Sequence, residues 1–226
     1  MRALALSSPD LSQATLEELR LALAPEIAAA AVFDGWSHTA LDAAAETVGV
    51  DPAVARLAFP GGAMDMIAAW IAGVDADMAE ALPPVVLAQL PIRARIGRLI
   101  RFRLDAVRGC EEALTRALAI MAMPQNVPAA LRFGWRSADV MWRLAGDTAT
   151  DYNHYTKRAI LAGLYAATLA VFAQDETAGK ADTLEFLDRR IDGVMRFEKA
   201  KSRWLRPDTD RFSLVRFLGR LRYPAS

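Results

Sequence analysis

The segment from residue 133 to residue 172 constrains the fold of this chain most strongly, because it ends in an almost uninterrupted apolar run, Ala159–Ala173. A helix that is apolar on every side is buried in a protein core, in lipid, or in both. The run is shorter than the roughly 18–20 residues that a membrane-spanning helix needs. We therefore expect this segment to form a helix in the core of a soluble protein.

A shorter helix is predicted directly before this run, with Trp135 and Trp142 on one side of it. Asp139 lies three residues before Trp142, so the two side chains are neighbours on the helical surface. Gly146 is a suitable residue to end this helix, and Asp147 can cap the start of the next one. The segment is thus predicted to form two helices joined by a short polar turn.

Trp142 has two interpretations that the residues alone leave open. It shares a stripe with Trp135, which is typical of a core residue. It is also flanked by Asp139 and Arg143, and tryptophan and arginine are enriched in the residues that dominate protein–protein binding.

Helical periodicity continues along the rest of the chain, so we predict an all-α fold of about nine or ten helices. We expect one domain over residues 12–201, in which Pro25 can kink the first helix and Gly109 can bend a longer one. The predicted helices outside the central segment cover residues 12–33, 39–47, 52–58, 64–82, 85–90, 92–121 and 182–201.

Residues 35–62 have the spacing of a helix–turn–helix and resemble the N-terminal module of TetR-type regulators. Between Val32 and Pro91 a single basic residue, Arg56, stands against eight acidic ones, so this segment carries a net charge of −7. A DNA-binding module neutralises several phosphates with Lys or Arg. We therefore predict a TetR-like bundle whose first part, residues 12–82, has lost its DNA-reading surface and binds no nucleic acid. A TetR-type ligand-responsive transcriptional regulator is the alternative function.

A second resemblance is carried by spaced positions across the two central helices. These positions are Asp139, Trp142, Ala145, Gly146, Asp147, Asp151, Tyr155, Lys157, Arg158, Leu161 and Tyr165, followed by Asp175 and the run 183–191. The pattern resembles the Coq-nine family of accessory proteins in ubiquinone biosynthesis, and the resemblance covers roughly residues 28–195.

This resemblance implies a lipid-binding protein that is not an enzyme. It would hold an isoprenoid quinone intermediate or a phospholipid and present it to a membrane-bound di-iron enzyme, the demethoxyubiquinone hydroxylase. The hydroxylase would bind a patch around Trp142 that includes Asp139, Arg143 and Asp147. Arg143 departs from the family pattern, because an aromatic residue is expected there more often.

The bundle over residues 83–201 is expected to enclose the apolar pocket that such a ligand needs. The residues proposed to line this pocket are Phe102, Met121, Leu131, Leu161, Leu164, Tyr165 and Phe172. Five arginines crowd the start of the helix predicted over 92–121, namely Arg93, Arg95, Arg98, Arg101 and Arg103. They are interpreted as a solvated face with partners among the acidic residues between Val32 and Pro91, and anionic lipid headgroups are the alternative.

The tail over residues 207–223 is predicted to be an amphipathic helix on the membrane surface. From Arg196 to the end, nine basic residues stand against three acidic ones, a net charge of +6. Its proposed membrane-binding residues are Leu214, Arg216, Phe217, Leu218, Arg220 and Leu221. A helix docked on its own bundle or on a dimer mate is the alternative.

Catalytic and metal-binding motifs are absent from the sequence, so no cofactor or metal is expected. Asp151 and His154 could in principle do acid–base work, but the preferred interpretation is a polar first turn of a helix, in which Lys157 and Arg158 pair with nearby acids. The single cysteine, Cys110, excludes an internal disulfide and suits a reducing compartment. We expect a cytoplasmic protein at the inner face of a membrane, or on the matrix side of the mitochondrial membrane if the source is eukaryotic, without a signal or transit peptide. A homodimer rests on analogy with TetR-like folds alone.

Overall fold

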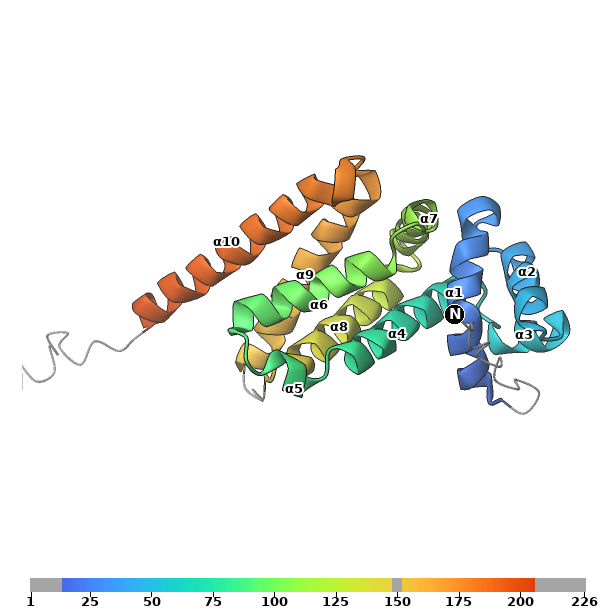
Figure 1. Cartoon of the computed structure of the whole chain (residues 1–226), viewed down its shortest axis with the longest axis horizontal. Coiled ribbons are helices and arrows are strands. Elements are labelled where there is room, and N and C mark those ends of the chain that lie inside the picture. The colour runs from blue at the N-terminus through green and yellow to red at the C-terminus, as the bar shows by residue number, and fades with distance from the viewer. Residues whose placement is uncertain (1–13, 148–151, 206–226) are drawn as a thin grey trace, which may run out of the picture. The chain divides into compact units, whose positions relative to one another are not determined.

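The structure is a computed structural model that describes residues 14–147 and 152–205. Within these ranges every regular element is a helix and none is a strand (Figure 1), which confirms the all-α prediction. The chain divides into two compact units, Met1–Ile191 and Asp192–Ser226. The predicted membrane helix over 207–223 lies outside the described residues, as do the first 13 residues.

The helices have the following bounds: α1 (Leu16–Asp34), α2 (His38–Val48), α3 (Pro52–Ala58), α4 (Ala63–Ala81), α5 (Pro84–Leu87), α6 (Ile92–Ala106), α7 (Glu111–Met121), α8 (Val127–Leu144), α9 (Tyr152–Gln174) and α10 (Ala181–Leu205). A short 3₁₀ turn, Ala178–Lys180, precedes α10.

One predicted helix, over residues 92–121, is wrong in its continuity. The structure divides it into α6 and α7, and Gly109 between them adopts a φ of +86°. That left-handed conformation breaks a helix, although the apolar positions keep helical spacing on both sides of the break. For α1 the sequence allowed a kink at Pro25. The structure instead shows one helix that continues through Pro25 without interruption.

The first three helices form the helix–turn–helix part of the molecule, and their ends follow from local residues. Thr15 and Glu18 form a reciprocal capping box at the start of α1. Asp51 caps α3 and Pro52 occupies its first helical position. Gly49, with a φ of +74°, ends α2 in the left-handed conformation.

Trp36, in the turn between α1 and α2, joins this part to the rest of the bundle. Its indole Nε1–H donates a hydrogen bond to the carbonyl oxygen of Ala113 in α7, at 2.9 Å. Its ring lies 5.3 Å from the ring of Trp70 in α4, centre to centre. The helix–turn–helix part therefore shares one hydrophobic core with the helices that follow it.

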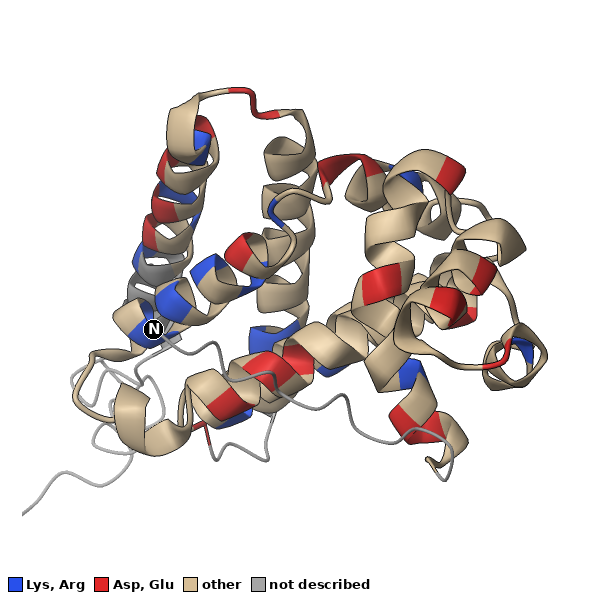
Figure 2. Cartoon of the chain, turned by 45° about the vertical axis from the view of Figure 1, so that its right-hand side comes forward, with Lys and Arg blue, Asp and Glu red and all other residues tan. Residues whose placement is uncertain are grey.

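Helix α4 is central to the bundle, because it packs against α1, α6, α7 and α8. Figure 2, in which the ribbon is coloured by residue type, shows acidic positions spread over α1–α4 with few basic ones among them, as the sequence indicates. Arg95 at the start of α6 does not lie on a free basic face. Its guanidinium donates hydrogen bonds to the carbonyl oxygens of Ala88, Leu90 and Ala145.

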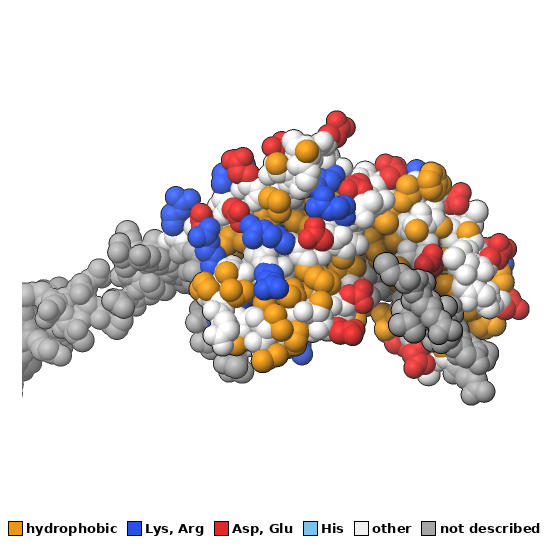
Figure 3. Space-filling view, in the orientation of Figure 1, with side chains coloured by type: hydrophobic (Ala, Val, Ile, Leu, Met, Phe, Trp, Pro, Cys, Tyr) orange, Lys and Arg blue, Asp and Glu red, His pale blue; other side chains and the backbone are white. Residues whose placement is uncertain are grey.

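Some hydrophobic side chains are exposed on the surface. Val85 and Val86 on α5 are exposed, and Figure 3 shows hydrophobic atoms gathered in this region. By length and composition, the part of α9 from His154 to Gln174 could cross a membrane. The sequence expectation, which counted only the uninterrupted apolar run, did not include this possibility. In this structure α9 packs against α8, α7 and α6.

A matched pair of glycine substitutions tests the break between α6 and α7. We expect Gly109→Ala to lower the free energy of unfolding by about 1–3 kcal/mol, because a Cβ is strained at that φ. Gly73→Ala in the middle of α4 should be neutral or stabilising by about 0.5–1 kcal/mol. An added Cβ meets no atom within 4 Å at either position, so the pair isolates backbone conformation. Equal effects in urea unfolding would contradict this assignment.

Candidate functional site: an apolar cavity and a cluster of ion pairs

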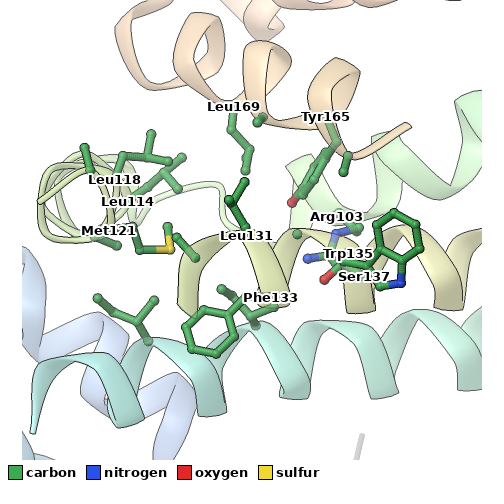
Figure 4. A pocket seen from close by; sticks show the side chains of 18 of the residues that line it. Arg103, Leu114, Leu118, Met121, Leu131, Phe133, Trp135, Ser137, Tyr165 and Leu169 are labelled. Carbon is green, nitrogen blue, oxygen red and sulfur yellow. The ribbon is translucent and has the colours of Figure 1, made fainter. Parts of the chain in front are cut away.

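Five helices, α4 and α6–α9, surround a cavity of about 660 Å³. Its large side chains are almost all hydrophobic, and many of them are labelled in Figure 4. They include Ile67, Trp70, Ile71 and Val74 from α4, Leu114, Leu118 and Met121 from α7, Leu131, Phe133 and Trp135 from α8, and Tyr165 and Leu169 from α9. A cavity of this size and character is typical of a site for an apolar small molecule.

Helix α9 contributes mostly small residues to the cavity wall. Ala159, Ala162, Gly163 and Ala166 all line it. Small side chains on one helix leave the space that large ones on the facing helices would otherwise fill. The cavity therefore exists because this strip of α9 has little side-chain volume.

The predicted lipid-binding residues fall into two groups. Met121, Leu131 and Tyr165 line the cavity. The other four do not: Leu161 and Phe172 are buried in the core, and Phe102 and Leu164 pack against it. The prediction favoured large apolar residues, whereas α9 lines the cavity mainly with small ones.

One end of the cavity is polar and deeply buried. We call Arg103, Ser137 and Tyr165, which line the cavity, together with Asp75, which pairs with Arg103 but does not line the cavity, the polar end. The guanidinium of Arg103, only 2% exposed, donates a hydrogen bond to the carboxylate of Asp75. The Ser137 hydroxyl donates to the other oxygen of that carboxylate at 2.9 Å. The guanidinium carbon of Arg103 lies 4.8 Å from the centre of the Tyr165 ring, within the range of a cation–π contact.

Burial raises the pKa of the Asp75 carboxyl, while the charge of Arg103 and the hydrogen bond from Ser137 oppose that shift. The interpretation of all five arginines as a solvated face is therefore wrong for Arg103, whereas the expected pairing with an acid of the preceding segment is confirmed by its ion pair with Asp75. Its position gave a signal, because Arg103 follows Ile96 and Leu99 at helical spacing and so falls on the buried stripe of α6. Ser137, a small polar residue within α8, gave no comparable signal.

A second cluster of charges fixes α8 to α9. Arg158 on α9 is buried, with its side chain 2% exposed. It donates to Asp139 at 2.6 Å and to Asp147 at 3.1 Å. Lys157 donates to Asp147 at 2.6 Å, and Arg143 pairs with Asp139. The expectation that Lys157 and Arg158 pair with nearby acids is confirmed.

This cluster changes the interpretation of the predicted partner-binding patch. The side chains of Asp139 and Asp147 are 15% and 6% exposed. Their main role is to hold the buried Arg158 in place inside the protein. Arg143 is the most accessible member of the described cluster, with 72% of its side chain exposed. Trp142 is half-buried and donates its indole N–H to the carbonyl oxygen of Lys157 at 3.0 Å. Part of the Trp142 side chain thus packs against the core, and the binding of a partner by its accessible part stays a prediction.

The residues considered for acid–base chemistry are not assembled into a described site. Asp151 lies outside the described residues, and His154 stacks edge-on against Tyr155. Within 14–147 and 152–205, no three His, Cys, Asp or Glu residues come together as a group that could hold a metal ion.

The fold defines the structural class of this protein, a TetR-like helical bundle. The crystal structure of the TetR transcriptional regulator from Nitrosomonas europaea has a TM-score of 0.59 to this chain, covering 80% of it and 98% of the regulator. Sequence identity is 20%, so the likeness concerns the fold alone. It confirms the predicted TetR-like architecture.

Residues 127–198, which span α8, α9 and most of α10, match the sequence model of the COQ9 family. The chain therefore contains a COQ9 domain, and the predicted resemblance to the Coq-nine family is confirmed. Mitochondrial ubiquinone biosynthesis protein COQ9 from Rattus norvegicus is 33% identical over 168 residues, 71% of this chain and 54% of that protein. The Homo sapiens protein is 30% identical over 168 residues, 71% of this chain and 52% of that protein. The chain spans about half the length of the curated relatives it matches.

Removing Arg158 should destabilise the protein strongly. Arg158→Met leaves two largely buried carboxylates without their shared partner, so we expect the free energy of unfolding to fall by about 3–5 kcal/mol. Arg143→Met removes an exposed arginine from the same cluster and should change it by less than about 1 kcal/mol. Urea unfolding of both variants measures the difference. A small effect for Arg158→Met would show that the cluster does not hold α8 to α9.

The same cluster predicts a pH dependence. Burial alone would raise the pKa of Asp139, but hydrogen bonds from Arg143 and Arg158 outweigh it and hold that pKa below its usual value. A depressed carboxyl pKa stabilises the folded state above the unfolded pKa of about 3.9, and this contribution is lost as the pH falls through the folded pKa. The stability difference between the natural chain and Asp139→Asn should therefore be larger at pH 7 than at pH 3. A difference that does not change with pH would contradict the assignment.

Proposed function

We propose that this protein is an accessory protein of ubiquinone biosynthesis that binds an isoprenoid quinone intermediate or a phospholipid. It would present the bound molecule to a membrane-bound di-iron enzyme, the demethoxyubiquinone hydroxylase, without catalysing a reaction itself. The observation that carries this proposal is the apolar cavity formed partly by the COQ9 domain. The names of the curated relatives, which are ubiquinone biosynthesis proteins, support the pathway.

The physical chemistry of the ligand favours such a carrier. A polyprenyl quinone is almost insoluble in water, so its transfer to an enzyme requires an apolar environment outside the bilayer. The cavity offers that environment, and its wall includes Leu131, which is 69% exposed. An exposed leucine beside the cavity gives an apolar tail a path between the cavity and a membrane.

The docking surface for the hydroxylase is proposed at the accessible part of the Trp142 patch. Arg143 and the exposed edge of Trp142 supply an arginine and an aromatic ring beside each other, the residue types that dominate binding surfaces. Asp139 and Asp147 would stabilise this surface by binding the buried Arg158. The tail over 207–223 is proposed to place the protein on the inner face of the membrane.

The charges of the helix–turn–helix part weigh against the alternative role as a transcriptional regulator. The helix that would read DNA, α3, carries one cation, Arg56, and its guanidinium is paired with Asp42 at 3.0 Å. The surrounding acidic residues would repel phosphates.

Filling the cavity tests ligand binding. Ala162→Phe places a ring in the cavity and should abolish the uptake of a geranyl-substituted 1,4-benzoquinone, measured by native mass spectrometry. Ala170→Phe makes the same change at an exposed position of α9 outside the cavity and should leave uptake unchanged. Equal uptake by both variants would show that the quinone binds outside this cavity. No uptake by the natural chain would contradict the proposed ligand binding.

Reversing the charge of Arg143 tests the docking surface. We expect Arg143→Glu to weaken binding to the purified hydroxylase by about tenfold or more, since arginines at the centre of an interface often contribute above 1 kcal/mol. Arg189→Glu is the control, because Arg189 is also exposed and also pairs with an acid four residues before it. Surface plasmon resonance gives both dissociation constants. Equal weakening by both variants would indicate a general charge effect, and no weakening by Arg143→Glu would exclude this surface.

A further inference from the structure

The lining of the cavity is exposed on one side only. Its residues from α4 and α6 are buried or half-buried. The exposed lining residues come from the end of α7, the first half of α8 and α9, and they are Ala122, Val127, Leu131, Ala159, Gly163 and Ala166. We call these six residues the mouth of the cavity. None of them is polar, so a molecule that enters or leaves the cavity crosses an apolar surface.

The surface around the mouth is also apolar. Leu131 is 69% exposed, and Val127 and Met123, four and eight residues before it, are 39% and 44% exposed. Tyr155 on α9 is 62% exposed, and its ring lies 6.0 Å from the ring of Trp135 on α8. Helix α9 is apolar enough for a lipid environment, and only 28% of its most apolar stretch is buried in this structure. A large exposed apolar patch marks a surface that binds a protein or a membrane.

The charges near the mouth favour a membrane. Between Arg116 and Asp139 the only charged residues are Arg132 and Arg136. Both are exposed, and each directly follows an apolar residue that lines the cavity. Residues 159–174 of α9 include no charged residue. Exposed apolar side chains with tryptophan, tyrosine and arginine beside them are typical of the boundary between lipid and water.

A second copy of the chain fits this surface less well. In a symmetric dimer the same surface meets itself, so Arg132 and Arg136 of one copy would lie near those of the other. The nearest acidic residue in the sequence, Asp139, binds Arg143 and Arg158 and is not available to balance them. The headgroups of an anionic membrane supply the missing negative charge.

We propose that the mouth of the cavity docks on the surface of an anionic lipid bilayer. Leu131 enters the boundary between headgroups and acyl chains, with the rings of Trp135 and Tyr155 beside it. Arg132 and Arg136 contact the lipid phosphates. An apolar ligand then passes between the bilayer and the cavity without crossing water. This inference rests on the proposed function, and it adds a membrane contact made by the described helices to the one proposed for the tail.

A matched pair of fluorescent labels tests this contact. Leu131 and Leu57 are both 69% exposed, but Leu57 lies on α3 in the acidic helix–turn–helix part. In the full chain with Cys110→Ala, either Leu131→Cys or Leu57→Cys provides a single cysteine for the dye NBD. The vesicles contain phosphatidylcholine and phosphatidylglycerol, with or without doxyl-labelled lipid. The doxyl lipid should quench the dye at position 131 and leave the dye at position 57 unchanged, even though the tail can hold both labelled chains on the vesicle.

Replacing the two arginines tests the role of charge. Arg132→Gln/Arg136→Gln should weaken binding to the same vesicles about ten- to thirtyfold, because each basic residue near an anionic surface contributes about a factor of five. The control Arg189→Gln/Arg190→Gln removes the same charge and should change binding little. Both control residues are exposed and already contact side chains four residues before them on α10. Co-sedimentation with the vesicles measures the affinities, and the difference should shrink as salt is added.

The outcomes separate this inference from the proposed function. No quenching at position 131, or equal quenching at positions 131 and 57, would show that the mouth does not face the bilayer. Equal weakening by both pairs of arginine substitutions would contradict the charge contact. A change in NBD fluorescence at position 131 that grows with protein concentration, without vesicles, would make this face an interface between two copies. Quinone uptake without vesicles tests the proposed function separately, because it does not require this contact.

Discussion

The ion pair between Asp75 and Arg103 joins α4 to α6 in the interior of the bundle, and the Ser137 hydroxyl ties α8 to the same carboxylate. Two opposite charges in a protein core are costly to desolvate and are tolerated only where their geometry and remaining hydrogen bonds are good. Hydrophobic side chains of similar volume would hold these three helices together as well. The ion pair adds a polar surface at the inner end of an otherwise apolar cavity, and the arrangement of the surrounding helices determines which molecule can reach it.

Helix α9 forms another wall of the cavity, and a second group of ion pairs holds it in place. Arg158 is held by Asp139 from α8 and by Asp147 from the following turn, which fixes the first turns of α9 against α8. Beyond this anchor the side of α9 that faces the cavity is built from alanine and glycine. These ion pairs hold α9 in position where few side chains pack between the helices, and so they keep the cavity open. The same ion pairs lie next to Trp142 and Arg143. The proposed docking surface is therefore adjacent to the charges that hold α9 in place.

Much of the fold could be predicted from sequence because its signals are local. The caps at Thr15 and Asp51 and the periodicity of α4 and α8 depend on residues a few positions apart. The division of the predicted 92–121 helix depended on the conformation of Gly109, which periodicity does not report. The site was harder to predict. Met121, Leu131 and Tyr165 were chosen for size and do line the cavity, but Leu161 and Phe172 lie in the core. Whether a large apolar residue faces a cavity or a neighbouring helix depends on packing between distant segments. Ion pairs of Arg103 and of Arg158 with acidic residues could be expected from the sequence, but the burial of these arginines could not, because it depends on packing between segments far apart in the chain.

The central claim is that this cavity carries an apolar molecule in the cell, and lipid extraction from the purified natural chain tests it most directly. Mass spectrometry of the extract should find an isoprenoid quinone or phospholipid in near-stoichiometric amount, and much less of it in an extract of Ala162→Phe purified in parallel. A protein that purifies without any apolar molecule, and takes up none when an isoprenoid quinone is added, would contradict the account.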